Sequence, residues 1–248
     1  MSDDEIPEDE IDIELRSPAE IGARLVILAS LLRRAQLVNS ADQEETSREL
    51  FDLRHWLSDE GVLSHATDDE RRLIEAPRAS STNVDATDVA RNGESLAALG
   101  WAVGLVHGMA PYDQFASSAG VLAGIPEAWD NVASFISSLH PRSDDLIEAE
   151  RERAELWLWR AQIEADRQAT RGSTRDDIES AIQDVARDAD AAKLLPNIAN
   201  DFLLNGVPFR DLPAETQEIV AIIAERRLHA LNWLCGFGED WNQVPLAV

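Results

Sequence analysis

Residues 225–244 read ERRLHALNWLCGFGEDWNQV and hold charged, amide and aromatic side chains at a higher density than the rest of the chain. Apolar residues recur there at three- and four-residue steps as far as Leu234, and Gly236 follows. This pattern predicts the end of a buried helix with a glycine stop. We expect Trp241 to fold back on that helix, and the other helices to assemble around it.

Arg227 falls on the apolar stripe of this last helix, because three and four steps along a helix return to the same face. A guanidinium among apolar side chains must bind a carboxylate or several carbonyls, since burying an unpaired charge destabilises the fold by roughly several kcal/mol. An earlier helix offers Glu94 on a stripe with Trp101, and Arg91 lies one turn before it. The sequence therefore predicts that Glu94 pairs with Arg227, Arg226 or both.

The candidate polar cluster gathers the residues that these two helices and the tail would bring together. It comprises Arg91, Glu94, Arg226, Arg227, Asn232 and Trp241. One interpretation is a structural ion pair that fixes the register of two helices, and this is the interpretation we favour. The other is an anion-binding or catalytic arginine. No catalytic residue is assigned.

A metal site has little support in the sequence. Glu225 and His229 stand four residues apart and could supply two ligands, with His107 as a third, but a catalytic zinc needs three protein ligands and an open position. A surface Glu–His pair is the simpler interpretation. Glycine-rich phosphate loops, nucleophile elbows and paired-carboxylate motifs are missing from the sequence. We therefore predict no metal and no cofactor.

The seven tryptophans could line an aromatic pocket, but tryptophans at helical spacing are more often part of a core. Cys235 is the only cysteine, which excludes an intramolecular disulfide and a multi-cysteine metal site. It follows Trp233 and Leu234, so a small buried thiol is expected there.

The charge balance is strongly acidic, with 47 Asp and Glu against 22 Lys and Arg and a formal net charge of −25 over 248 residues. Such a surface repels nucleic acid and anionic lipid, because both bind through a cationic footprint. A basic protein partner would fit it. The same acidic excess would also serve solubility or adaptation to a salty cytoplasm.

Residues 1–16 hold eight acidic residues against Arg16 and predict a solvated, disordered acidic tail. The alternation of Ile11, Ile13 and Leu15 with acidic residues leaves a short strand or docking segment open. Neither a signal peptide nor an apolar run near the ~18 residues of a membrane span is present, so we expect a cytoplasmic protein.

Capping residues, apolar spacing and glycines divide the remainder into helices, so the fold class is all-α. We expect one orthogonal or irregular bundle of eight to ten helices over residues 17–248, with residues 172–199 as a candidate insertion. The expected helices span about 18–38, 43–61, 67–76, 84–107, 113–123, 126–139, 143–170, 174–194 and 213–236. Residues 196–209 are expected to be irregular or a short helix.

Three segments resemble the bacterial family called domain of unknown function 4272. The clearest is the opening stretch, followed by residues 88–104, with an Arg-x-x-Glu motif and a Trp-Ala run, and residues 146–161, which end in Trp-Arg-Ala. The resemblance covers about residues 19–244. The family usually has an aspartate where this chain has Asn242, and it usually continues a little past this point. The resemblance implies a helical, cytoplasmic protein and brings no activity, cofactor or partner with it.

Two function classes follow from these observations. The first is a non-enzymatic cytoplasmic interaction protein that masks a basic protein. The alternative is an enzyme or small-molecule binder with a pocket near Arg91, Glu94, Arg227 and Trp241.

Overall fold

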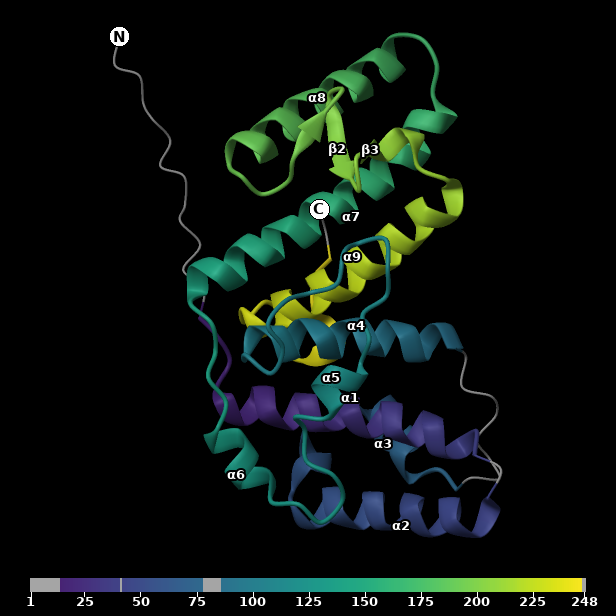
Figure 1. Ribbon diagram of the computed structural model, residues 1–248, viewed down its shortest axis with the longest axis vertical. Coiled ribbons are helices and arrows are strands. Elements are labelled where there is room, and N and C mark those ends of the chain that lie inside the picture. The colour runs from purple at the N-terminus through teal and green to yellow at the C-terminus, as the bar shows by residue number, and fades with distance from the viewer. Residues whose placement is uncertain (1–13, 41, 78–85, 247–248) are drawn as a thin grey trace.

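The computed structural model describes residues 14–40, 42–77 and 86–246 (Figure 1), and it is predominantly helical. Its elements, in chain order, are α1 (Pro18–Val38), α2 (Gln43–Asp59), η1 (Val62–His65), α3 (Asp68–Glu75), α4 (Ala86–Ala102), α5 (Ala119–Leu122), α6 (Val132–Ser137), α7 (Asp144–Ala169), α8 (Ser173–Ala191), β1 (Asn197–Ile198), β2 (Asp201–Leu204), β3 (Val207–Pro208), η3 (Phe209–Asp211), α9 (Ala214–Leu234) and η4 (Trp241–Gln243). The predicted helical class is confirmed.

The long helices form a stack along the long axis of the molecule, in the order α7, α9, α4, α1 and α2 (Figure 1). Each helix in this series contacts the next. Helices α4 and α9 therefore lie inside the stack, in agreement with the expectation that the other helices assemble around the last one. Helix α8 and the small sheet lie at one end of the stack, while α2, α3 and α6 lie at the other.

Local capping chemistry explains where several helices begin. Ser17 and Glu20 form a capping box at the start of α1, and Thr67 and Glu70 form a second one at the start of α3. Each box satisfies backbone N–H groups that have no partner inside the helix. The predicted starts of α1, α3 and α7, and the predicted span of α9, agree with the structure to within about two residues.

Helix α4 ends at Ala102 and not near His107, so the predicted C-terminal boundary was wrong. Gly104 has a φ of 81°, in the left-handed region that glycine adopts without strain. Arg142, just before α7, takes the helix-end carbonyls: its backbone N–H donates to Ala102 and its Nε donates to Trp101 over 2.7 Å. The chain therefore leaves the helix at Gly104 and not at Gly108.

The expected helices at 113–123 and 126–139 are also shorter in the structure, as α5 and α6. Asn131 is the N-cap of α6, and its side chain accepts from the backbone N–H of Ser134 over 2.7 Å. The residues before it form a four-residue turn, in which the N–H of Asp130 donates to the carbonyl of Glu127. An Asn or Asp placed inside an expected helix often marks its true start.

Residues 197–208 form three short antiparallel strands in the order β1-β2-β3, which corrects the expectation of irregular or helical structure. Both connections are two-residue turns with positive φ: 54° and 62° at Ala199 and Asn200, and 50° and 83° at Asn205 and Gly206. Turns of this kind match the twist of a hairpin. Asn-Gly at 205–206 is itself a strong hairpin signal, so this hairpin could have been predicted.

The buried apolar residues fall into two groups, and α9 takes part in both. Its C-terminal half, including Leu231 and Trp233, packs with α1 and α4, whereas its N-terminal half, including Val220 and Ile223, packs with α7 and the sheet. Arg16 also joins this core, because its N–H donates to Leu234 O over 2.9 Å and its guanidinium lies over the Trp233 ring. Leu15 packs against the same core, so the end of the predicted tail is ordered on the protein, while residues 1–13 of that tail lie outside the described residues.

Within residues 14–40, 42–77 and 86–246, every helix is too short or too polar to cross a lipid bilayer.

Candidate functional site

Arg227 and Glu94 form an ion pair between α9 and α4. The Nε of Arg227 lies 3.0 Å from Oε2 of Glu94, and the two side chains are 1% and 0% exposed. The other carboxylate oxygen of Glu94 accepts a hydrogen bond from the backbone N–H of Ala116. Both oxygens of this carboxylate are therefore occupied by donors within the protein.

Tyr112 completes the surroundings of this ion pair. The guanidinium carbon of Arg227 lies 4.4 Å from the centre of the Tyr112 ring, a cation–π arrangement. The Tyr112 hydroxyl donates to Glu150 Oε1 on α7 over 3.2 Å. Burial raises the pKa of Tyr112, and the negative charge of Glu150 raises it further. The hydroxyl is therefore held neutral and works as a hydrogen-bond donor.

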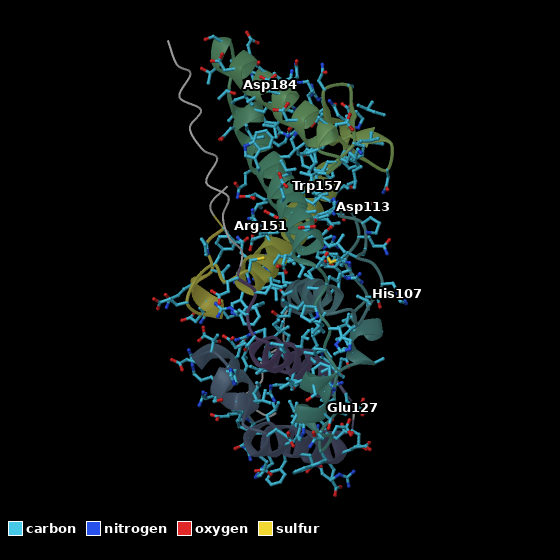
Figure 2. All side chains as sticks on the ribbon, turned by 90° about the vertical axis from the view of Figure 1, so that its left-hand side faces the viewer. His107, Asp113, Glu127, Arg151, Trp157 and Asp184 are labelled. Atoms are coloured by element: carbon cyan, nitrogen blue, oxygen red, sulfur yellow. The ribbon has the colours of Figure 1, made fainter. Side chains whose placement is uncertain are left out.

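The other predicted cluster residues lie elsewhere. Arg226 pairs with its neighbour Glu225 over 3.4 Å, and its carbonyl accepts from Ser95. Asn232 donates to Pro245 O over 2.9 Å, and its oxygen accepts from Arg151 of α7, which Figure 2 labels. Arg91 is half-buried one turn before Glu94. The structure thus brings Glu94 and Arg227 together and leaves Arg226 and Asn232 outside the pair.

Trp241 belongs to a second buried group, built on α1, α3 and α9. Its ring lies 5.4 Å from the ring of Trp233, and the guanidinium carbon of Arg24 stands 4.6 Å from its centre. Nη1 of Arg24 donates to both carboxylate oxygens of Glu70, over 2.7 and 2.8 Å. The segment after α9 therefore folds back on the helix as expected, and its Trp241 packs against Arg24.

His229 faces this second group. Its Nε2 lies 2.9 Å from Trp241 O, so this nitrogen is occupied by a backbone carbonyl. Burial, together with the charges of Arg226 and Arg24, lowers the pKa of His229 to about 4. His107 is an exposed residue beyond the end of α4 (Figure 2). Among the described residues, no three His, Cys, Asp or Glu side chains are grouped so as to hold a metal ion.

Cys235 is buried directly after α9. Burial raises the pKa of its thiol to about 11, so the thiolate is scarce at neutral pH. The residue fits the expected small buried thiol.

A third polar group, which was not predicted from the sequence, fixes the sheet to α7. Arg160 is fully buried and makes paired hydrogen bonds of 2.7 and 2.9 Å to the two carboxylate oxygens of Asp201 on β2. It also bonds Glu164 one turn along α7 over 2.8 Å. Burial by itself raises the pKa of Glu164, but hydrogen bonds from Arg167, Gln168 and Arg160 outweigh it and bring the pKa to about 2.

These arrangements suit structure better than catalysis. Each of these buried carboxylates is paired with a guanidinium, so none is left as a free base, and the tyrosine and cysteine are held neutral. The sequence contains a signal for some of the buried residues that were not predicted and none for others. Arg24 shares the apolar stripe of α1 with Ile21 and Leu28, so helical periodicity could have identified it, whereas Tyr112 and Asp201 lie outside helices and carry no periodic signal.

Comparison with known proteins agrees with the resemblance found in the sequence. Residues 5–178 match the model of the family described as Domain of unknown function (DUF4272). The matched region contains the segments 88–104 and 146–161 and ends before 225–244. Neither a curated protein nor a solved structure matches the chain significantly. Because the match covers well over half of its 248 residues, the chain belongs to the DUF4272 family.

Proposed function

We propose that this protein is a non-enzymatic interaction protein of the bacterial cytoplasm that binds and masks a basic protein. The observation that carries the proposal is the way the two signs of charge are distributed. The chain has 47 acidic and 22 basic residues, and Arg24, Arg34, Arg160 and Arg227 are buried.

The buried arginines are neutralised by carboxylates that are buried with them, so the acidic excess of the chain stays on its surface. Arg24, Arg160 and Arg227 are at most 4% exposed and pair with carboxylates. Arg33 and Arg142 direct their donors to backbone carbonyls. Helix α8 adds the exposed carboxylates of Asp176 and Asp177, whereas its exposed Asp184 pairs with Arg187 over 3.0 Å.

This surface favours a cationic partner for a physical reason. Clustered surface carboxylates raise the local concentration of cations and speed the encounter with a basic protein. They repel nucleic acid and anionic membrane surfaces, so we propose neither as a partner. The burial of Glu94 and Arg227 supports an interaction protein over the alternative of an enzyme or small-molecule binder at that cluster, because substrate has no direct access to a buried pair.

Affinity purification tests the proposal. The tagged protein is incubated with lysate of its source organism at about 0.15 M and about 1 M salt, because surface electrostatics are screened at the higher value. We expect a specific basic protein to co-purify in a fixed stoichiometry at the lower salt concentration and to be released at the higher. If no basic protein is enriched over a neutral control protein, the proposal is wrong.

A further inference from the structure

A hollow of about 570 Å³ lies between α1, α2 and the segment that runs from α5 to the turn before α6. We call it the Trp129 hollow. Its apolar wall includes Leu37, Leu53 and Leu122, and its charged and aromatic lining residues are Arg33, Glu49, Asp52, Glu127 and Trp129. The volume lies within the range of sites that hold ligand groups, roughly 300–1,000 Å³.

Trp129 is presented to solvent by a closed turn. The N–H of Asp130 donates to Glu127 O over 3.0 Å, and Asp130 Oδ2 accepts from the N–H of Glu127 over 3.0 Å. From α2, the buried indole of Trp56 donates to Asp130 O over 2.9 Å and fixes the turn to the protein. Trp129 is the third residue of this turn and is 58% exposed.

Tryptophan at this position is unfavourable for folding. Its φ is 75°, and the third position of a turn with positive φ normally holds glycine or asparagine. A bulky side chain there strains the backbone. Because the ring is largely exposed, its burial offsets little of the free energy that the backbone strain costs. A strained, exposed aromatic ring at the rim of a hollow indicates a binding role.

Arg33 anchors the same segment from α1. Its Nη2 donates to Leu122 O over 3.1 Å and to Ile125 O over 2.8 Å, and its Nη1 donates to Pro126 O. These bonds satisfy the carbonyls at the end of α5 and hold the turn against α1. The Arg33 guanidinium therefore donates its hydrogen bonds to backbone carbonyls. Burial lowers the pKa of Arg33, and the negative charge of Glu127 opposes this effect.

The facing wall, on α2, supplies two carboxylates. Glu49 and Asp52 stand three residues apart and therefore project from one face of the helix. Within the part of the chain that the structure describes, neither side chain forms an ion pair, unlike the buried acids Glu94 and Glu70. With Glu127, the hollow has three carboxylates against one guanidinium.

We propose that the Trp129 hollow binds an arginine side chain of a basic protein partner, with the guanidinium stacked on the Trp129 ring and donating to Glu49 and Asp52. This inference rests on the proposed function and names its docking site. A guanidinium fits better than an ammonium, because it is planar, stacks on an indole and donates to carboxylates in a fork. Most of the lining is exposed, including Gln36, Ser40, Ala119 and Ala123, which suits a side chain that stays attached to its own protein.

Peptide titration tests the site in the full-length protein. The probes are three peptides of equal length, in which glycine alternates with arginine, lysine or neutral citrulline. The seven tryptophans give separate indole N–H signals by NMR, and a Trp129→Phe variant identifies the signal of Trp129. We expect the arginine peptide to shift that signal first and most at about 0.15 M salt, with a weaker effect from lysine and none from citrulline.

Variants separate the hollow from general attraction between opposite charges. Trp129→Gly and the pair Glu49→Gln/Asp52→Asn are each expected to weaken arginine-peptide binding about tenfold by calorimetry. The pair Glu152→Gln/Asp177→Asn removes the same charge from exposed positions on α7 and α8 and is expected to leave the affinity within about twofold. Asp184, also on α8, and Glu127 lie near opposite ends of the molecule in Figure 2.

The outcomes distinguish the two proposals. If both hollow variants bind the arginine peptide as tightly as the unaltered protein, the docking site is wrong, while a basic protein that co-purifies with the same variants leaves the proposed function standing. If Trp129-dependent peptide binding is seen but no basic protein co-purifies, the hollow stands and the masking function is wrong.

Discussion

Arg227 on α9 and Glu94 on α4 are joined by a 3.0 Å contact between Nε and Oε2 at the centre of the helical stack. They stand 133 positions apart in the chain, and both are buried. The pair fixes how the two middle helices lie against each other, because a shift of either helix by one residue would leave a buried charge without a partner. Buried ion pairs are best attested in this role of fixing register.

Replacing Glu94 with alanine is therefore expected to destabilise the protein strongly. The change strands the Arg227 guanidinium and the N–H of Ala116, and breaking one side of a buried pair costs roughly 3–5 kcal/mol. We expect the melting temperature to fall by about 10 °C in a thermal unfolding scan. An exposed acid with no buried partner, Glu152, serves as the control in Glu152→Ala. A melting temperature that stays unchanged for Glu94→Ala contradicts the role we assign.

His229 gives the protein a pH dependence with a definite sign. The pKa of His229 is lowered to about 4 from an ordinary value near 6.5. Between these values the unfolded chain binds a proton that the folded protein does not, so stability is lost as the pH falls from about 6.5 toward 4. Urea unfolding at pH 7 and pH 5, compared between the unaltered protein and His229→Gln, is expected to show a loss that is smaller in the variant by on the order of 1–2 kcal/mol. Equal losses of stability in the unaltered protein and in His229→Gln would contradict the assignment of this pH dependence to His229.

The buried bonds between Arg160 and Asp201 hold the sheet to α7, since the sheet itself has only short strands. Asp201→Ala is expected to cost roughly 3 kcal/mol. Hydrogen exchange should accelerate most in residues 173–208, which contain α8 and the sheet, and least in α1 and α4. Asp177→Ala, at an exposed position on α8, provides the comparison. Uniform acceleration along the chain, or none, contradicts a local fastening role.

The strain at Trp129 predicts an unusual ranking of substitutions. Because φ is 75° and the ring is 58% exposed, Trp129→Gly removes strain and gives up little burial, whereas Trp129→Ala keeps the strain. The glycine variant is expected to be more stable than the alanine variant by about 1 kcal/mol in urea unfolding. The reverse order would mean that the backbone of the turn is not strained by its side chain.

Features that follow from helical periodicity could be predicted from the sequence. The stripe on α9 placed Arg227 in the core, and the cost of an unpaired charge pointed to Glu94 as its partner. The starts of α1 and α3 followed from the spacing of Ser17 and Glu20 and of Thr67 and Glu70. These features depend on short-range geometry, which is why one sequence was enough.

Features that depend on contacts between distant segments could not be predicted in the same way. Nothing near Tyr112 in the sequence indicates that its ring lies under Arg227, and α4 ends early because Arg142 binds its last carbonyls. Trp129 falls within the expected helix at 126–139, where a tryptophan is expected to be part of the core. The helix begins only after its N-cap residue Asn131, which leaves Trp129 in an exposed turn.

If the Glu94–Arg227 pair serves the fold and binding takes place on the acidic surface, removing the pair should leave binding intact. The most direct measurement is a calorimetric titration of the Glu94→Gln/Arg227→Met double variant with the arginine-containing peptide. This variant removes the buried guanidinium and keeps an acceptor for the N–H of Ala116. We predict a folded protein, by circular dichroism, that binds the peptide within about twofold of the unaltered affinity. A folded double variant that binds about tenfold more weakly or not at all would contradict this assignment of roles.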